Sequence, residues 1–280
     1  MTYCVALRMD QGLLFLSDTR TNAGVDNVSA TRKMRTWSVP GERFITLLSA
    51  GNLATTQAVV SLLDERSKAP ADRDPTILQA PTMFQVANLI GQTLREVIAA
   101  QTDQEGQASS SAVQGSAFQG SAFQGSAVPG SAFQGSAFQG SAVHSTAFNS
   151  TLIVGGQIAD MEPRLFLIYP EGNFIEAQDD APFFQIGETK YGRPILVRVF
   201  DPAMSFDEAA KLLLVSYDST AKANLSVGPP LDLQMYAAGS LQAQPSRRIE
   251  ADDPLLRSIS TNWGDALNIA FKTLPDVNLF

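Results

Sequence analysis

The second residue of the chain is a threonine, at the head of an apolar run of strand length, TYCVALRM. If Met1 is removed, Thr2 carries a free α-amine beside its own hydroxyl. An α-amine has an unperturbed pKa of about 7.7–8.0, so a part of it is neutral near neutral pH and can accept the hydroxyl proton. Thr2 is therefore a candidate nucleophile that carries its own general base.

The composition argues against the commoner kinds of catalytic site. The single histidine, His144, lies in a low-complexity tract, which disfavours a Ser–His–Asp or Cys–His mechanism and a metal site built from several histidines. The sequence contains no G-x-S-x-G, Walker or H-E-x-x-H motif. We expect neither a cofactor nor a metal. An enzyme of acyl chemistry with this sequence needs a base other than histidine.

Asp18 and Lys33 are candidate charge partners of Thr2. Residues 10–12 have turn chemistry and join two strands into a hairpin. That turn sets Thr2 across from residue 18 or 20 and puts Thr2 and Asp18 on one sheet face, about 5–8 Å apart. Lys33 begins the next strand, and an Asp–Lys pair beside Thr2 would ease loss of the hydroxyl proton. Taken singly, Asp18 also fits a turn residue and Lys33 a solvated edge charge.

The segment SAGNLATTQAVV offers an oxyanion hole. A predicted strand ends at Gly51, and a helix with Asn52 as its N-cap begins there. Backbone N–H groups at such a junction point toward developing negative charge, and a glycine lets a substrate backbone come close. Gly51 alone is more typical of a tight turn, but these candidates occur together and in a consistent order, which favours a site.

Hydrophobic periodicity predicts the elements that position these residues. Predicted strands cover 2–9, 12–18, 32–39, 43–51, 150–158, 164–170, 173–177, 183–187 and 231–239, and predicted helices cover 52–66, 81–100, 191–200 and 205–223. Asn52 and Thr82 are expected N-caps, and Ser205 with Glu208 has capping-box spacing. This order predicts an α+β protein whose sheets pack together under outer helices. The stretch 250–280 is interpreted as packing without chemistry.

Residues 111–150 divide into eight pentads such as SAFQG. A five-residue step alternates faces in a strand and rotates by about 140° per repeat in a helix, so neither element gains one apolar stripe. We expect a single domain over 1–280, interrupted at 107–149 by a mobile Gly/Ser insertion. The alternative is a pentapeptide-repeat β-helix, which these pentads resemble and which would have about two coils.

Net charge, apolar runs and cysteine content limit the kinds of partner and the location that we expect. The chain has 280 residues, of which 44% are hydrophobic, with 20 Lys+Arg against 28 Asp+Glu and a formal net charge of −8. An acidic protein with one short basic cluster at 32–35 is not expected to bind nucleic acid. No apolar run is long enough to cross a membrane, and the N-terminus lacks the features of a signal peptide. With one cysteine, Cys4, no internal disulfide can form, and we expect a cytoplasmic location.

Several segments resemble a known family. TYCVALRMDQGLLFLSDTRTNAG, RKM, LLSAGN and FFQIGETKYGRPIL are similar to proteasome-type peptidases, specifically to the bacterial ancestral-β-subunit group called Anbu. The resemblance covers nearly the whole chain apart from the pentads. It implies an N-terminal-nucleophile hydrolase fold, a four-layer αββα sandwich, and self-association of like subunits into a ring or spiral homo-oligomer.

The resemblance also implies roles for individual residues. By motif match these are Thr2 as nucleophile, Asp18 and Lys33 as its charge partners, Gly51 as oxyanion donor, Thr21 and Ser49 in the substrate groove, and Ser226 as support for the threonine amine. The sequence departs from proteasome β-subunits at two places. Ala223, Asn224 and Leu225 stand where an aspartate precedes the serine, and Glu188 occupies the position of a supporting serine.

The leading functional hypothesis is an N-terminal threonine hydrolase that cleaves peptide or amide bonds in a self-assembled particle. One alternative is an amidase or peptide-tailoring enzyme that uses the same threonine on a small amide substrate, since family members tend to be encoded beside ATP-grasp and transglutaminase-like proteins. The other is a non-catalytic assembly or scaffold protein, which the missing aspartate and the repeat would favour.

Overall fold

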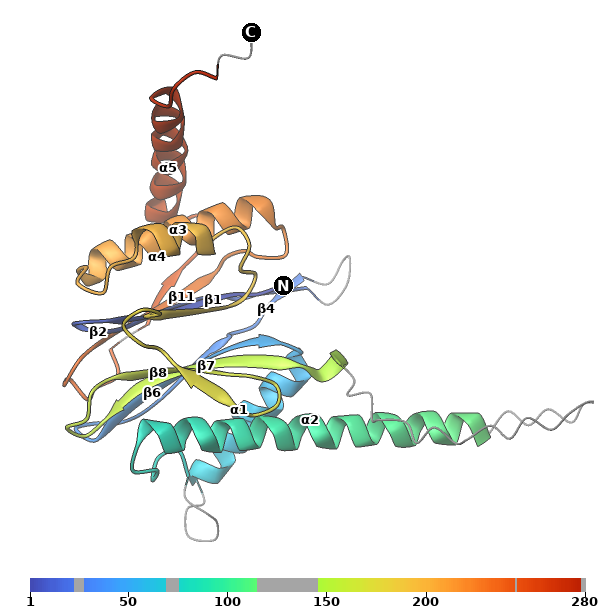
Figure 1. Ribbon diagram of the computed structural model, residues 1–280. Coiled ribbons are helices and arrows are strands. Elements are labelled where there is room, and N and C mark those ends of the chain that lie inside the picture. The colour runs from blue at the N-terminus through green and yellow to red at the C-terminus, as the bar shows by residue number, and fades with distance from the viewer. Residues whose placement is uncertain (23–27, 69–75, 115–145, 245, 278–280) are drawn as a thin grey trace, which may run out of the picture.

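The architecture consists of two stacked sheets between two layers of helices (Figure 1). A computed structural model describes residues 1–22, 28–68, 76–114, 146–244 and 246–277. The strands are β1 (Tyr3–Met9), β2 (Gly12–Asp18), β3 (Arg20–Asn22), β4 (Val28–Ala30), β5 (Met34–Val39), β6 (Arg43–Gly51), β7 (Ser150–Ile158), β8 (Arg164–Ile168), β9 (Phe174–Glu176), β10 (Phe183–Gly187), β11 (Leu231–Ala237) and β12 (Arg247–Ile249). The helices are α1 (Leu53–Lys68), α2 (Met83–Gln114), α3 (Arg193–Val199), α4 (Phe206–Ala223) and α5 (Pro254–Lys272).

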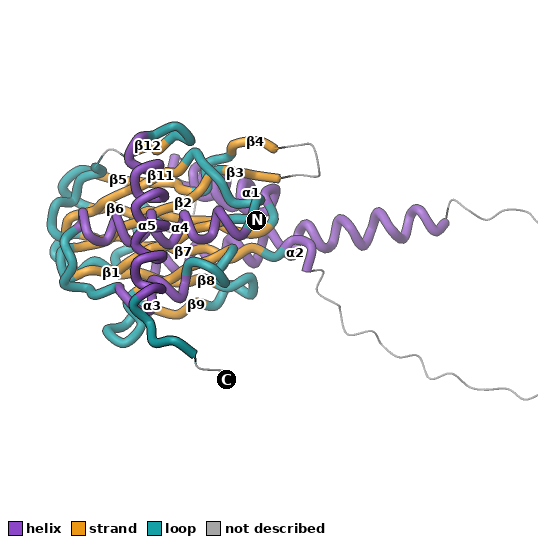
Figure 2. The backbone as a smooth tube through the Cα atoms, turned by 90° about the horizontal axis from the view of Figure 1, so that it is seen from above, coloured by secondary structure: helices purple, strands orange, loops and turns teal. Residues whose placement is uncertain are grey.

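Each of the two large sheets has five antiparallel strands. The first has the order β10-β1-β2-β11-β12 and lies under α3 and α4, and the second has the order β5-β6-β7-β8-β9 and is covered by α1 and α2. The predicted α+β class and four-layer αββα sandwich are thereby confirmed. The small β3–β4 hairpin, which periodicity did not predict, lies beside the N-terminus (Figure 2).

The alternation of side chains along the strands fills the three interfaces between the layers. In β1, Tyr3, Val5 and Leu7 pack toward the α3–α4 layer. Cys4 and Ala6 face the opposite way and pack between the two sheets. Because strand side chains alternate with a period of two, a sheet buried on both faces needs apolar residues at nearly every position, as β1 and β2 have.

The register of the first hairpin corrects one prediction. Gly12 belongs to β2 and pairs with Met9, so the turn has two residues and not three. Paired residue numbers therefore sum to 21, as at Cys4 opposite Ser17. Continuing the ladder places Asp18 opposite Tyr3, so the prediction that Thr2 and Asp18 share a sheet face is wrong. A change of one residue in turn length reverses every facing relation, because the period is two.

Most helix boundaries follow the capping residues. Asn52 accepts from the Thr55 N–H at 3.1 Å, Thr82 accepts from the Gln85 N–H at 3.2 Å, and Ser205 forms the expected capping box with Glu208. All three predicted N-terminal caps are confirmed. Helix α2 is longer than the predicted 81–100, and it extends beyond the sandwich in both views (Figures 1 and 2).

The predicted insertion at 107–149 lies mostly outside the described residues. Residues 107–114 continue α2, and Thr146–Phe148 form a short 3₁₀ turn before β7. The pentads between them, 115–145, are not described. Both interpretations of the repeat, mobile insertion and pentapeptide-repeat β-helix, therefore stay predictions.

The C-terminal helix α5 contradicts the interpretation of 250–280 as packing. Every residue of α5 is described, and Leu256 alone among them is buried. Apolar side chains further along are exposed, with 49% of Leu267, 66% of Ile269 and 75% of Phe271 accessible. Figure 1 shows α5 standing away from the α3–α4 layer. The apolar pattern of this segment therefore does not serve the core of its own subunit.

Candidate active site

Thr2 sits at the start of β1, where the turn after β10 holds its backbone. Thr2 is buried, with only 9% of its surface exposed. Its carbonyl oxygen accepts the Glu188 N–H at 2.6 Å. Gly187 has φ +84°, and a Cβ there would lie 2.1 Å from that same carbonyl oxygen. Glycine is therefore required for the turn to approach Thr2 this closely.

On the other side of Thr2, Asp18 and Lys33 form a buried ion pair. Lys33 Nζ donates to Asp18 Oδ1 at 2.7 Å, and Asp18 has no exposed surface. Asp18 Oδ1 also accepts the Tyr3 N–H at 2.8 Å. The carboxylate thus reaches the end of β1 from a position opposite Tyr3. The pair that the sequence suggested does form, although through a different register from the one expected.

The pKa of Asp18 is set by its burial and by the groups that donate to it. Burial raises the pKa of Asp18, and the ammonium of Lys33 and the Tyr3 N–H oppose that rise. Lys33 Nζ also donates to the Arg20 carbonyl at 2.7 Å and stands 3.5 Å from the Met1 carbonyl oxygen. The cation is thereby held at the peptide bond that joins Met1 to Thr2.

Gly51 ends β6 at the junction with α1. It has φ +117°, and a Cβ at this position would lie 2.4 Å from the Asn149 carbonyl oxygen. The next residue, Asn52, donates its N–H to the same carbonyl at 3.1 Å and caps α1. The sharp change from strand to helix therefore requires glycine and brings the junction to the cavity beside Thr2.

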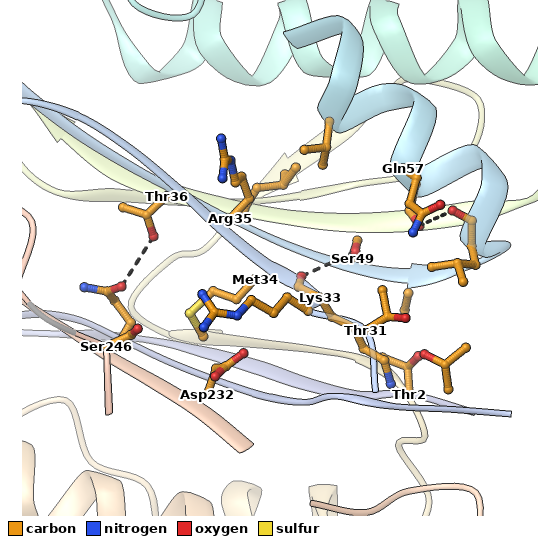
Figure 3. A pocket seen from close by; sticks show the side chains of 18 of the residues that line it. Thr2, Thr31, Lys33, Met34, Arg35, Thr36, Ser49, Gln57, Asp232 and Ser246 are labelled. Atoms are coloured by element: carbon orange, nitrogen blue, oxygen red, sulfur yellow. Dashed lines mark hydrogen bonds between the residues drawn. The ribbon is translucent and has the colours of Figure 1, made fainter. Parts of the chain in front are cut away.

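A cavity of about 1050 Å³ opens beside Thr2, between the two sheets. Five of the predicted site residues line it, namely Thr2, Thr21, Lys33, Ser49 and Gly51. Figure 3 shows Thr2, Lys33 and Ser49 around this space. The hydroxyl of Ser49 donates to the Lys33 carbonyl at 3.3 Å, whereas the Thr21 hydroxyl has no hydrogen-bond partner within the described residues.

Two predicted residues do not line the cavity. Asp18 is absent from the cavity wall and is paired with Lys33, which does line it. Ser226 lies in the loop after α4, where its N–H donates to Asn224 Oδ1 at 3.0 Å. In the part of the chain that the structure describes, no hydrogen bond joins Ser226 to Thr2. The same loop reaches the site through Gly228, whose N–H donates to Asp18 Oδ2 at 3.4 Å.

The two departures from the proteasome pattern contact each other. Asn224 Nδ2 donates to Glu188 Oε2 at 2.8 Å, and the Lys190 N–H donates to Glu188 Oε1 at 3.0 Å. The Lys190 N–H, with the Asn224 amide, lowers the pKa of the Glu188 carboxyl. A carboxylate on the turn that holds Thr2 thus contacts the loop that carries Ser226. Sequence inspection noted both substitutions, but it could not show that they pair.

Sequence reasoning also missed Asp232 on β11, which lines the cavity opposite Lys33 and Met34 (Figure 3). Only 4% of Asp232 is exposed. The sequence LDLQMYAAG carries polar residues two apart, at 232 and 234, and this period of two would have put both on one face of the strand.

Other kinds of site find no support among the described residues. No three His, Cys, Asp or Glu side chains in this part of the chain lie close enough to share a metal ion. Nor does any helix that the structure describes combine the length and hydropathy that crossing a bilayer requires.

Solved structures from three bacteria are similar to this chain over its whole length. An Anbu (Gly-1) mutant from Hyphomicrobium sp. strain MC1 is 43% identical, with a TM-score of 0.79 and coverage of 100% of both chains. Anbu (ancestral beta-subunit) from Yersinia bercovieri is 40% identical, with a TM-score of 0.81 and the same coverage. The helical assembly of the Anbu complex from Pseudomonas aeruginosa is 36% identical, with a TM-score of 0.79 and coverage of 99% of both chains.

Neither a scan against protein-family models nor a search of curated proteins gave a match. The structural matches nevertheless combine full coverage with identities far above those at which only the fold is shared. The sandwich of two antiparallel sheets between helices agrees with them. The chain therefore belongs to the Anbu family of ancestral β-subunits, which are proteasome-like N-terminal-nucleophile hydrolases.

Proposed function

We propose that this protein is an N-terminal threonine hydrolase that cleaves peptide or amide bonds within a self-assembled particle. The observation that carries the proposal is the buried Lys33–Asp18 pair next to Thr2, on the wall of a cavity of about 1050 Å³. A buried ammonium on a cavity wall is costly unless it is paired, and here it is paired on one side and open to the site on the other. Such an arrangement suits a threonine that must lose its hydroxyl proton.

The proposed reaction begins once Met1 is removed and the Thr2 amine is free. Thr2 Oγ attacks the carbonyl carbon of the substrate, and its proton passes to the amine. The carbonyl oxygen develops negative charge and accepts a hydrogen bond from the Gly51 N–H. The amine then protonates the leaving nitrogen, the C–N bond breaks and an ester with Thr2 remains. Water hydrolyses this ester and regenerates the free hydroxyl.

Lys33 contributes electrostatically in this scheme. Its ammonium lowers the cost of negative charge on Thr2 Oγ, and the effect is strong because the pair is shielded from water. Asp18 holds the ammonium in place and is a positioning residue. Glu188 and Gly187 hold the Thr2 backbone from the opposite side. Thr21 and Ser49 are proposed to bind the substrate backbone, and Ser226 is proposed to support the amine.

The self-assembled particle is supported by surfaces that the single subunit leaves uncovered. The Pseudomonas aeruginosa relative is described as a helical assembly. In this chain, exposed apolar side chains on α5 include Ile269 and Phe271, and those on α3 include Val197 and Val199. Exposed apolar residues on neighbouring helices typically mark a protein–protein contact. A second copy of the chain is the proposed occupant.

Sedimentation velocity tests the assembly. Phe271→Asp should shift the particle toward smaller species, while Asn268→Asp, which adds the same charge to an exposed position of α5, should leave its size unchanged. Equal sedimentation of both variants and the wild type would rule out α5 as a contact between copies.

Mass spectrometry tests the catalytic proposal. The purified protein is analysed intact and after incubation with a peptide epoxyketone, a reagent that requires a hydroxyl and a free α-amine on one residue. We expect loss of Met1 and one adduct on Thr2. Thr2→Ala should abolish the adduct, and Thr2→Ser should retain it. A wild-type chain that loses Met1 and never reacts would favour the scaffold function instead.

A further inference from the structure

Asp232 is a buried acid on the cavity wall that the proposed mechanism does not use. It lies on β11 opposite Ser17 of β2, and the side chains of both residues face the space between the two sheets. The carboxylate points into the cavity (Figure 3). Asp232 is 96% buried, since 4% of it is exposed. A carboxylate in such a place needs hydrogen-bond donors.

The donors around Asp232 satisfy only one of its oxygens. Arg248 Nη1 donates to Oδ1 at 3.1 Å. Oδ2 has no hydrogen-bond partner within the described residues, and neither has the hydroxyl of Ser17 on the adjacent strand. An unpaired buried oxygen on a carboxylate is costly. A donor that enters from the cavity would remove this cost.

Among the described residues, Arg248 is the one cation that pairs with Asp232. Arg248 is shared between two acids, because its Nε also donates to Glu250 Oε1 at 3.1 Å. The other cations on the cavity wall are engaged elsewhere or exposed. Lys33 is paired with Asp18, and Arg35 is paired with Asp64 at 2.8 Å. Arg32 is exposed, so solvent screens its charge.

We propose that Asp232 makes the cavity selective for peptide substrates with a cationic side chain, lysine or arginine, whose nitrogen donates to Asp232 Oδ2. This inference rests on the proposed function, because it assigns the substrate class of the same site. A charge-assisted hydrogen bond in a space shielded from water distinguishes a cation from an apolar group of equal length. Thr2 performs the bond cleavage, and Asp232 selects what is held there.

The test compares pairs of peptide epoxyketones that differ in one side chain. In each pair, lysine is replaced by norleucine, which has the same carbon chain without the amine, at the residue next to the epoxyketone or two residues further away. The rate of adduct formation on Thr2 is followed by intact mass spectrometry. At one of the two positions, the wild type should react about tenfold or more faster with the lysine probe, as expected for one charge-assisted hydrogen bond.

Variants identify the source of the preference. Asp232→Asn should abolish the lysine preference, and Arg248→Gln, which removes the competing cation but keeps a donor, should increase it. Asp180→Asn removes the same charge from an exposed loop and should leave the preference unchanged. Thermal unfolding of each variant confirms that it is folded.

The outcomes separate the two proposals. If no probe labels the wild type, the hydrolase proposal fails, and the substrate assignment fails with it. If norleucine probes label Thr2 as fast as lysine probes at both positions, the nucleophile stands and the role of Asp232 is overturned, a result that does not depend on any variant folding. A lysine preference that survives in Asp232→Asn overturns it as well.

Discussion

Two regions hold Thr2, and they use different physics. On the hairpin side, Asp18 and Lys33 form an ion pair with both side chains nearly fully buried. On the β10 side, Gly187 and Glu188 hold the Thr2 carbonyl by close backbone approach and one N–H···O bond of 2.6 Å. The first region places a charge at the reacting group, whereas the second fixes the position of the backbone.

The buried carboxyl groups of these two regions, Asp18 and Glu188, differ in the direction of their pKa shifts. The pKa of Asp18 is raised, because burial outweighs the ammonium and the N–H groups that oppose it. The pKa of Glu188 is lowered, because a backbone N–H and the Asn224 amide both donate to its charged form. The two carboxyl groups therefore differ mainly in the effect of burial, which dominates at Asp18 and is outweighed by the Lys190 N–H at Glu188.

The largest expected effect comes from breaking the ion pair. Lys33→Met leaves the Asp18 carboxylate buried without its cation and should lower the free energy of unfolding by about 3–5 kcal/mol, with loss of Thr2 labelling. The double variant Lys33→Met/Asp18→Asn removes both charges and should regain part of that stability but no labelling. Urea unfolding of the two variants measures the difference. Equal stability of the single variant and the wild type would mean that the pair is not buried in solution.

Gly187→Ala tests the second region. The added Cβ would overlap the Thr2 carbonyl oxygen and should cost about 1–3 kcal/mol of strain, with slower labelling of Thr2. Gly41→Ala is the matched control, because Gly41 has a similar φ of +75° and no atom within 4 Å of the added Cβ. In both variants an alanine must adopt a positive φ, which lowers the free energy of unfolding. The difference in stability between the two variants therefore measures the contact with Thr2. Identical unfolding and labelling of the two would contradict the close approach.

Glu188→Gln should have the smallest effect of the three. The glutamine would still offer one oxygen to the donors Asn224 and Lys190, but without the negative charge. The free energy of unfolding should fall by about 1–2 kcal/mol near pH 7. A matched comparison is Asn224→Ala, which removes one of the donors and should raise the pKa of Glu188. If the two substitutions add independently in the double variant, the Glu188–Asn224 contact contributes nothing to stability.

The pH dependence of these variants should have opposite signs. Because the folded pKa of Glu188 is lowered, its stabilisation is present above the ordinary glutamate value of about 4.3 and is lost as the pH falls through the folded pKa. Because the folded pKa of Asp18 is raised, its contribution is complete below the ordinary aspartate value of about 3.9 and is lost as the pH rises through the folded pKa. Unfolding of Glu188→Gln and Asp18→Asn against the wild type across this acid range measures both slopes. Slopes of the same sign would refute the contrast.

Local patterns predicted most of the elements, because each depends on neighbouring residues. Apolar runs joined by turn residues predicted the hairpins, and Asn52, Thr82 and Ser205 marked helix starts through bonds within one turn. The error at the first hairpin came from a single residue of turn length, which periodicity does not resolve. The stretch 250–280 was not predicted as a helix, and its interpretation as packing was wrong because apolar residues in a sequence do not show whether they meet their own core.

The sequence by itself determined the chemistry available at the N-terminus: a threonine that can serve as nucleophile and base, without a histidine to replace it, next to residues that form strands and a helix start. Only the tertiary structure decided which side chains meet there. The Lys33–Asp18, Glu188–Asn224 and Asp232–Arg248 contacts each join separate strands or loops. Their formation depends on strand register, on the stacking of two sheets and on how loops close over the strand ends, and none of these is encoded in the periodicity of one segment.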